Sequence, residues 1–324
     1  MTPLKIFTDI KAPVELLTWF QEQIQPHQLI LPTQPGASVL AEAPVDPLMA
    51  EADIILGQPR TEGVLASSKA SWLQVSSAGF TRYDTPEFRL AAQSRGLTVT
   101  NSSGVYDQAC AEHVFAFMLA QARLLPQSLG SHFPNGRAEW MALRNGCRSL
   151  HGQSVLIAGY GAIAAKLVKM LAPFDMKITA MRRTARGDEG IRVIPPEALL
   201  SELPAADHVI NILPENAESR GLFGTAHFAA MKPGAIFYNI GRGTTVDQTA
   251  LANALQSGKP AAAWLDVTDP EPLPEGHPLR ELPNCFITPH IAGGHHDELH
   301  TVFRHFLDNL ERYLAGKPLN NRVM

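Results

Sequence analysis

The sequence predicts an α/β protein with two domains, each built on a parallel sheet, and the first of them discontinuous along the chain. The chain has 324 residues, which is enough for two separate hydrophobic cores. Short apolar runs alternate with amphipathic stretches along most of its length, as is typical of parallel α/β layers. The last helical stretch, His295–Leu314, is expected to pack back on the first domain. The predicted domains are therefore 1–102 with 292–324, and 103–291.

Composition and charge narrow the class of protein. A hydrophobic content of 45% with 18% charged residues is that of a globular protein. The net charge of −4 favours neither nucleic acid nor a membrane as partner. The start of the chain has no long apolar stretch behind a basic segment, so a cytoplasmic location is expected.

The cysteines and a histidine cluster give no sign of a metal site. The cysteines are odd in number and widely spaced, which fits a reducing compartment and lacks zinc-ligand spacing; they are Cys110, Cys147 and Cys285. The histidine cluster near the C-terminus has no fixed set of further ligands; it consists of His295, His296 and His300. No metal is therefore expected.

The first third of the chain contains four predicted strands and a well-marked helix. The strands are Lys5–Thr8, Asp53–Leu56, Leu73–Ser76 and Leu97–Thr100. The helix lies before the fourth strand, because Thr85 can cap it and Pro86 suits its first position. Gly96 can end it.

A long apolar helix and an irregular segment follow. Gln108–Leu125 is apolar around most of its circumference, which indicates burial on more than one side, at a domain joint or a subunit interface. Pro126–Leu150 contains several glycines with poor periodicity, and we expect an extended arm there. Regular alternation of strands and helices then resumes at Ser154–Ala158 and continues to Thr288.

A glycine-rich turn, Gly159–Ala164, joins a predicted strand directly to a predicted helix. Gly159 permits a tight turn, and Gly161 lets the backbone approach a pyrophosphate at the helix N-terminus. Ala164 replaces the third glycine, where only close helix–strand packing is needed. A turn that binds nothing is the alternative, but its context favours a dinucleotide and Rossmann-like domains. The expected cofactor contacts here are Gly159, Gly161, Ala162 and Ile163.

The residues after the next strand indicate which dinucleotide is bound. An NAD enzyme usually has an acidic residue about 20 residues past the first glycine. This chain has Arg182 there, with Arg183 beside it, and guanidinium groups bind a 2′-phosphate that a carboxylate would repel. NADP(H) is therefore the preferred cofactor and NAD(H) a possible one. The alternative is a solvated basic strand end, since Arg186 is also close.

Three polar residues near predicted strand ends have the chemistry of a proton-transfer site. Glu271 is a carboxylate that can orient and charge the imidazole of His290. Arg242, in Asn239–Gly243, is a cation fit for a substrate carboxylate.

The order of glycine-rich turn, Arg, Glu and His resembles that of the D-isomer-specific 2-hydroxyacid dehydrogenases, most specifically over Gly159–Gly294. The resemblance implies that Arg242 grips the substrate carboxylate and polarises the 2-oxo group. It implies that His290 is the general acid/base and Glu271 its partner. Asp266 matches a residue that contacts the nicotinamide carboxamide.

The resemblance extends to the first domain, which it makes the substrate-binding domain. The backbone N–H groups of Ala78 and Gly79 would meet the substrate carboxylate. It also implies a twofold homodimer formed through residues of about 106–150, the dimerisation arm. Pro214 is expected in a cofactor-side loop, where the residues that follow it depart from the family pattern. Phe80-Thr81 departs too, in the wall of the substrate pocket.

The function implied is NADP(H)-dependent reduction of a small 2-oxo acid, of the glyoxylate or hydroxypyruvate type, to the D-2-hydroxy acid. Two alternatives stay open: an NAD-linked 3-phosphoglycerate dehydrogenase-like enzyme, and a dinucleotide-sensing protein like the family's corepressors. A pure sensor needs no proton donor, so Arg242, Glu271 and His290 weigh against the second. Formate dehydrogenases carry Gln at the position of Glu271, which disfavours formate oxidation.

Overall fold

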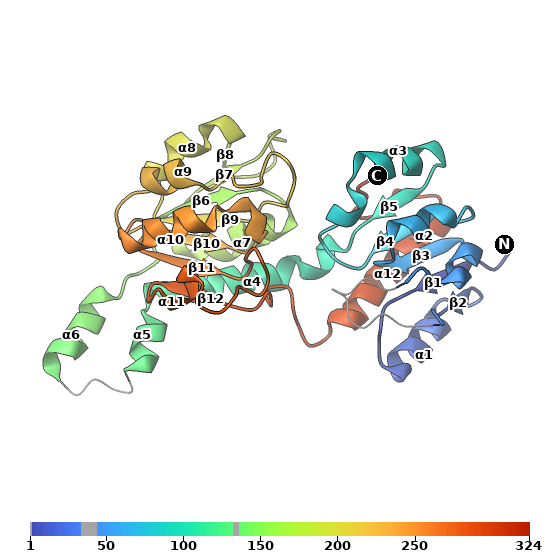
Figure 1. The fold of residues 1–324 in the computed structure, drawn as a ribbon, viewed down its shortest axis with the longest axis horizontal. Helices are drawn as coiled ribbons and strands as arrows, with labels where there is room; N and C mark the ends of the chain where they lie inside the picture. The colour runs from blue at the N-terminus through green and yellow to red at the C-terminus, as the bar shows by residue number, and fades with distance from the viewer. Residues whose placement is uncertain (1, 34–43, 132–135) are drawn as a thin grey trace. The chain divides into compact units, whose positions relative to one another are not determined.

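The computed structural model describes residues 2–33, 44–131 and 136–324, and it divides into two compact units (Figure 1). Unit 1 comprises Met1–Tyr106 and His295–Met324, and unit 2 comprises Asp107–Gly294. Each unit has its own parallel sheet, of five strands in unit 1 and seven in unit 2. The predicted fold class, α/β with two parallel sheets, is confirmed.

The sheet of unit 1 has the strand order β2-β1-β3-β4-β5, with every neighbouring pair parallel. Its strands are β1 (Lys5–Thr8), β2 (Gln28–Ile30), β3 (Ile54–Gly57), β4 (Trp72–Val75) and β5 (Thr98–Thr100). The four predicted strands are present within a residue of their expected ends. β2 was not predicted, because it is three residues long and lies at the partly exposed edge of the sheet, so its side chains show no clear alternation.

The C-terminal helix completes the core of unit 1. The helices of this unit are α1 (Val14–Gln23), α2 (Thr61–Ala66), α3 (Pro86–Ser94) and α12 (Glu298–Leu314), with short 3-10 turns η1 (Pro47–Glu51) and η2 (Thr81–Tyr83). In α12, Phe303 stacks on Phe20 with ring centroids 4.4 Å apart, and Phe306 stacks on Trp72 at 5.0 Å. All four rings are fully buried. Aromatic burial of this kind joins the two segments of the unit.

The sheet of unit 2 has the order β12-β11-β10-β9-β6-β7-β8, again all parallel. Its strands are β6 (Ser154–Ala158), β7 (Lys177–Met181), β8 (Arg192–Ile194), β9 (His208–Asn211), β10 (Ile236–Asn239), β11 (Ala262–Leu265) and β12 (Cys285–Ile287). The helices among them are α7 (Ala162–Leu171), α8 (Leu199–Glu202), α9 (Thr225–Ala230), α10 (Gln248–Gln256) and α11 (Pro278–Glu281). The central strands β9, β10 and β11 are fully buried and most of their residues are apolar, as is typical of parallel strands covered on both faces.

The segment after unit 1 is more helical than predicted. α4 (Ser103–Ala122) begins five residues before the expected Gln108 and ends three before Leu125. The expected irregular arm contains two helices, α5 (Leu125–Gly130) and α6 (Arg137–Gly146), which extend from the body of unit 2 (Figure 1). The expectation of irregular structure in Pro126–Leu150 was wrong, because the described glycines and the proline of this segment lie at the ends of helices. Strong helix formers such as Ala, Glu, Met and Leu fill the interior of α6.

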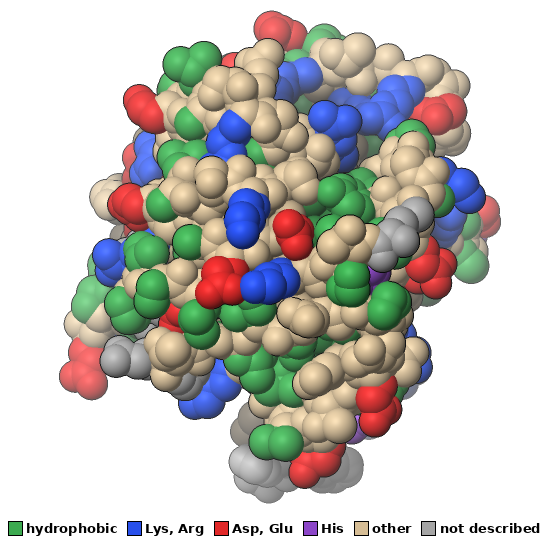
Figure 2. All heavy atoms as spheres, turned by 90° about the vertical axis from the view of Figure 1, so that its right-hand side faces the viewer, with side chains coloured by type: hydrophobic (Ala, Val, Ile, Leu, Met, Phe, Trp, Pro, Cys, Tyr) green, Lys and Arg blue, Asp and Glu red, His purple; other side chains and the backbone are tan. Residues whose placement is uncertain are grey.

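Other structural features bear on the predicted class. In the described part of the chain, no helix has the length and apolar character to cross a membrane. Figure 2 shows a face on which acidic and basic side chains lie interspersed.

All three cysteines are free, and burial raises the pKa of the Cys110 and Cys285 thiols to about 12. These two thiols are therefore protonated and unreactive at neutral pH.

A buried histidine in β9 makes the stability of unit 2 depend on pH. His208 is 3% exposed, its Nδ1 lies 3.0 Å from the Tyr238 hydroxyl, and its Nε2 lies 2.8 Å from Gln153 Oε1. Burial lowers the pKa of His208 from 6.5 to about 4. The unfolded chain therefore binds this proton at a higher pH than the folded chain does. The neutral, buried His208 therefore leaves the folded state fully stable above about pH 6.5. Its contribution to the free energy of unfolding declines as the pH falls and becomes constant below about pH 4.

We expect the free energy of unfolding to fall by roughly 2 kcal/mol between pH 7 and pH 5 because of His208. Urea unfolding at the two pH values, followed by circular dichroism, measures this loss. His208→Gln should remove the part of the pH dependence that His208 contributes. His151→Gln is the matched control, because His151 is exposed and should leave the dependence unchanged. Equal pH dependence in the unmodified protein, His208→Gln and His151→Gln would contradict the assigned role of His208.

Candidate active site

The glycine-rich turn between β6 and α7 has the backbone expected of a dinucleotide site. Gly159 has φ +100°, and a Cβ there would lie 3.3 Å from the Ile212 carbonyl oxygen, so the turn itself requires glycine. Gly161 has an extended backbone, and a Cβ there would meet no atom within 4 Å. Among the described residues, none lies close enough to require glycine at 161, whereas a phosphate approaching the backbone would. Ala162 and Ile163 begin α7, and Ala164 is fully buried, as its packing role predicts.

The two arginines after β7 each have a carboxylate partner. Arg182 Nη1 lies 3.1 Å from Glu189 Oε1, and its guanidinium is 6.0 Å from the ring centroid of Tyr160. Arg183 Nη1 lies 3.2 Å from Glu218 Oε2, and both of these side chains are largely exposed. Glu218 belongs to the loop after β9, which also contains Pro214. The structure therefore pairs each of these two cations with one acid, and their contact with a 2′-phosphate stays a prediction.

Arg242 lies in a turn at the carboxyl end of β10, held by buried amides. Its carbonyl oxygen accepts hydrogen bonds from Asn239 Nδ2 at 3.1 Å and from Thr245 Oγ1 at 2.6 Å. Asn211 Nδ2, at the end of β9, donates to Asn239 Oδ1 at 3.0 Å. The Arg242 guanidinium donates to the Gly241 carbonyl at 2.7 Å. Asn211 was not identified from the sequence. The feature that could have identified it is an amide side chain at the last residue of a predicted strand.

The structure brings the predicted acid and imidazole together. His290 Nδ1 lies 2.9 Å from Glu271 Oε2, and Glu271 Oε1 accepts a hydrogen bond from the Thr268 N–H at 3.0 Å. An ionised carboxylate only accepts hydrogen bonds, so we infer that Nδ1 carries a proton. Nε2 is then the nitrogen that can exchange a proton with a substrate. The side chains are 47% and 38% exposed, so the pair is accessible.

The loop that carries His290 is fixed by Asp266, at the end of β11. Asp266 is 2% exposed, and its Oδ1 accepts bonds from Thr288 Oγ1 at 2.6 Å and Ile291 N at 2.9 Å. Its Oδ2 accepts a bond from Ala292 N at 2.8 Å. His290 has φ +53°, a left-handed backbone that is uncommon outside glycine and frequent at functional sites. Asp266 therefore holds the loop that carries His290, and its predicted nicotinamide contact stays a prediction.

The same loop contacts helix α4 through a histidine. His113 Nε2 lies 3.3 Å from Thr288 Oγ1 and 3.6 Å from Asp266 Oδ1. Burial lowers the pKa of His113, although the neighbouring carboxylate acts in the opposite direction. We therefore interpret His113 as a neutral packing residue, and Thr288 as a residue of this loop that was not identified from the sequence.

Ala78 and Gly79 lie in unit 1, in the loop after β4. The loop is held by its carbonyl oxygens: Asn101 Nδ2 donates to the Ala78 carbonyl at 2.7 Å, and Ser77 Oγ to the Gly79 carbonyl at 2.6 Å. Within the described residues, the N–H groups of Ala78 and Gly79 have no protein hydrogen-bond partner. Free N–H groups fit the predicted contact with a carboxylate, which stays a prediction.

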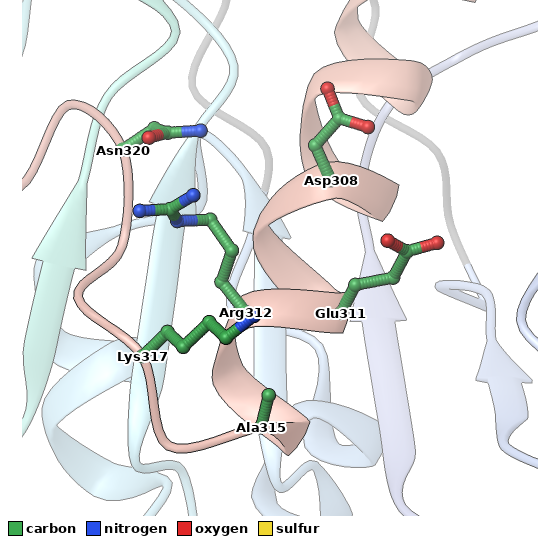
Figure 3. Close-up of a pocket in the computed structure, with 6 residues that line it drawn as sticks. All are labelled: Asp308, Glu311, Arg312, Ala315, Lys317 and Asn320. Carbon is green, nitrogen blue, oxygen red and sulfur yellow. The ribbon is translucent and has the colours of Figure 1, made fainter.

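A polar hollow in unit 1 lies at the C-terminal end of α12 (Figure 3). It is lined by Asp308, Glu311, Arg312, Ala315, Lys317 and Asn320. Acids and bases balance one another there, and Arg312 Nε already donates to the Pro318 carbonyl at 2.6 Å. The hollow contains none of the predicted site residues, so we do not assign the chemistry to it.

The parallel sheet of unit 2 with its strand–glycine turn–helix connection is that of an α/β dinucleotide-binding protein. Residues 115–292 match the NAD binding domain of the D-isomer specific 2-hydroxyacid dehydrogenases. The chain belongs to this family and is an NAD(P)-dependent 2-hydroxyacid dehydrogenase.

Individual relatives agree with this assignment. The chain is 34% identical to glyoxylate/hydroxypyruvate reductase B of Citrobacter koseri over 285 residues, 85% of each chain. It is 34% identical to the human glyoxylate reductase/hydroxypyruvate reductase over 71% of each chain. Among solved structures it is similar to an NADPH-dependent glyoxylate/hydroxypyruvate reductase from Sinorhizobium meliloti in complex with NADP and malonate. That likeness has a TM-score of 0.76 and 26% identity, and covers 100% of this chain and 97% of the other.

Proposed function

We propose that this enzyme is an NADP(H)-dependent reductase of a small 2-oxo acid, of the glyoxylate or hydroxypyruvate type, which forms the D-2-hydroxy acid. The observation that carries the proposal is the His290–Glu271 pair at 2.9 Å, in the same unit as Arg242 and the glycine-rich turn. These groups follow β10, β11 and β12, at the carboxyl edge where parallel sheets bind ligands. The names of the similar proteins support the substrate class.

The proposed roles follow from the charge that develops during reduction. The bound nicotinamide supplies the hydride. His290, protonated and paired with Glu271, donates a proton to the 2-oxo oxygen of the substrate. Arg242 binds the substrate carboxylate and stabilises negative charge on that oxygen. In the oxidative direction, a neutral His290 removes the hydroxyl proton.

Turnover of the purified protein tests this proposal. NADPH consumption with glyoxylate or hydroxypyruvate should exceed that with NADH. 3-Phosphoglycerate with NAD is the comparison that identifies the alternative dehydrogenase. Cofactor binding without turnover of any 2-oxo acid would indicate a dinucleotide sensor and refute the proposal.

We predict that Arg182 and Arg183 determine the cofactor preference. Joint replacement, Arg182→Asp with Arg183→Ala, should shift the ratio of kcat/KM for NADPH over NADH towards NADH by roughly tenfold to thousandfold. Charge-assisted contacts to the 2′-phosphate would be lost. Arg192→Ala, on the neighbouring strand β8, is the control for a change of net charge. A preference for NADH in the unmodified enzyme would overturn the prediction.

We also propose a homodimer formed through α4, α5 and α6. Apolar side chains on the two short helices are exposed, with Leu129 73%, Trp140 45% and Leu125 44% accessible. Large apolar side chains exposed on one segment of the chain favour a protein interface, and a twofold interface uses the same surface of both subunits. Light scattering at dilute concentration should give twice the mass of one 35.2 kDa chain. A monomer mass would refute the dimer.

A further inference from the structure

We infer that Glu189 is a positioning residue for cofactor choice: it fixes Arg182 and the loop 183–190 in the form that receives a 2′-phosphate. This inference rests on the proposed NADP(H) preference and extends it to a residue that does not itself bind the cofactor. An acid at this place would ordinarily be read as a group that repels NADPH. The contacts of Glu189 favour the opposite effect.

The carboxylate of Glu189 accepts three hydrogen bonds from its own surroundings. Oε1 accepts the Arg186 N–H at 2.7 Å and Arg182 Nη1 at 3.1 Å, and Oε2 accepts the Gly187 N–H at 2.8 Å. The side chain is 3% exposed although its loop is on the surface. The hydrogen bond from the Arg186 N–H is the main cause that lowers the pKa of Glu189, so the group is ionised at neutral pH.

Tyr160 ties the same loop to the glycine-rich turn. Its hydroxyl donates to the Glu189 carbonyl oxygen at 3.2 Å, and its ring lies 6.0 Å from the Arg182 guanidinium. Tyr160 is the residue between the two glycines of the turn. The loop, Arg182 and the predicted pyrophosphate site are therefore held in one hydrogen-bonded arrangement within unit 2.

Positioning fits this geometry better than competition with a phosphate. A guanidinium has five N–H donors, and Glu189 engages one nitrogen of Arg182, so donors remain for an anion. The Glu189 oxygens face Arg182 and two backbone N–H groups, which offset the carboxylate charge. A freely moving arginine side chain would lose more rotamer entropy on binding a phosphate than one already fixed.

Replacement of Glu189 by glutamine should break this arrangement despite the similar size. Glutamine has one oxygen and an NH₂ group, so it cannot accept the Arg186 and Gly187 N–H groups on two separate oxygens. One backbone N–H would face another donor, and the loop would open. The nearby pair of Arg183 and Glu218 is the natural contrast, because both side chains are more than 70% exposed and their contact organises no backbone.

The experiment is fluorescence titration of NADPH and NADH with the purified full chain and its Glu189→Gln and Glu218→Gln variants. Glu189→Gln should weaken NADPH binding by roughly tenfold to a hundredfold, with the Kd for NADH within about twofold of the unmodified value. Glu218→Gln should leave both constants within about twofold. In an Arg182→Ala background, Glu189→Gln should add little, because its effect acts through Arg182.

The outcomes separate this inference from the proposed function. Preference of the unmodified enzyme for NADH defeats the NADP(H) proposal itself. If the unmodified enzyme prefers NADPH, an unchanged or increased NADPH/NADH ratio in Glu189→Gln overturns the role of Glu189 alone. If Glu189→Gln does not fold, Tyr160→Phe replaces it, since it removes only the bond to the Glu189 carbonyl. It should lower the same ratio by a few-fold, and an unchanged ratio there would equally overturn the inference.

Discussion

Replacing His290 by alanine is expected to lower kcat for 2-oxo acid reduction by roughly a thousandfold or more. General acid catalysis by a positioned side chain contributes about 10²- to 10⁴-fold. The dinucleotide turn is unaffected by the change, so the Kd for NADPH should stay within about threefold. Stopped-flow turnover and fluorescence titration of the same preparation measure the two quantities.

Glu271→Gln is the informative companion to this variant. Glutamine has a single acceptor oxygen, so it cannot accept hydrogen bonds from His290 Nδ1 and the Thr268 N–H on two separate oxygens, and it removes the negative charge beside the imidazole. The protonated imidazole then loses its ion-pair partner, so kcat for reduction should fall. A control is His277→Gln, which lies on unit 2 outside the proposed site. Activity of His290→Ala close to that of the unmodified enzyme would refute the proposed role of His290 as the proton donor.

Arg242→Lys is expected to lower kcat/KM by about 10²- to 10⁴-fold. Lysine keeps the positive charge but loses the planar pair of N–H donors that matches a carboxylate, and it provides less stabilisation of charge on the 2-oxo oxygen. The main-chain turn should survive, because Asn239 and Thr245 hold the carbonyl of residue 242 and not its side chain. Steady-state kinetics with thermal unfolding as the folding control provides the measurement.

Arg192→Lys is the matched control for Arg242→Lys. Its guanidinium forms an exposed pair with Glu202, and exposed pairs contribute little to stability or function. Its kinetics should equal those of the unmodified enzyme. If Arg242→Lys retained full kcat/KM, the paired N–H donors of the Arg242 guanidinium would not be needed to bind the carboxylate or to stabilise the transition state.

Local signals in the sequence determined much of the fold. The glycine-rich turn, the strand before it and the helix after it are contiguous, so the residues themselves specify the connection. Strand β1 and helix α12 were likewise predicted from their own periodicity. Short elements such as β2, α5 and α6 were missed or misread, because their form depends on an edge position or on end residues rather than on a repeating pattern.

The support around the site was decided only by the tertiary structure. The sequence indicated Arg242, Glu271 and His290 as chemistry-bearing residues because of their order and residue type. It could not indicate that Asp266 binds the Thr288–Ala292 loop, or that Glu189 is enclosed by its own loop and Arg182. The physical reason is that periodicity records which face of an element is buried, whereas a hydrogen-bond partner is set by which strand ends the parallel sheet brings side by side. Sequence alone therefore determined the class of chemistry, and the fold decided how each reacting group is held.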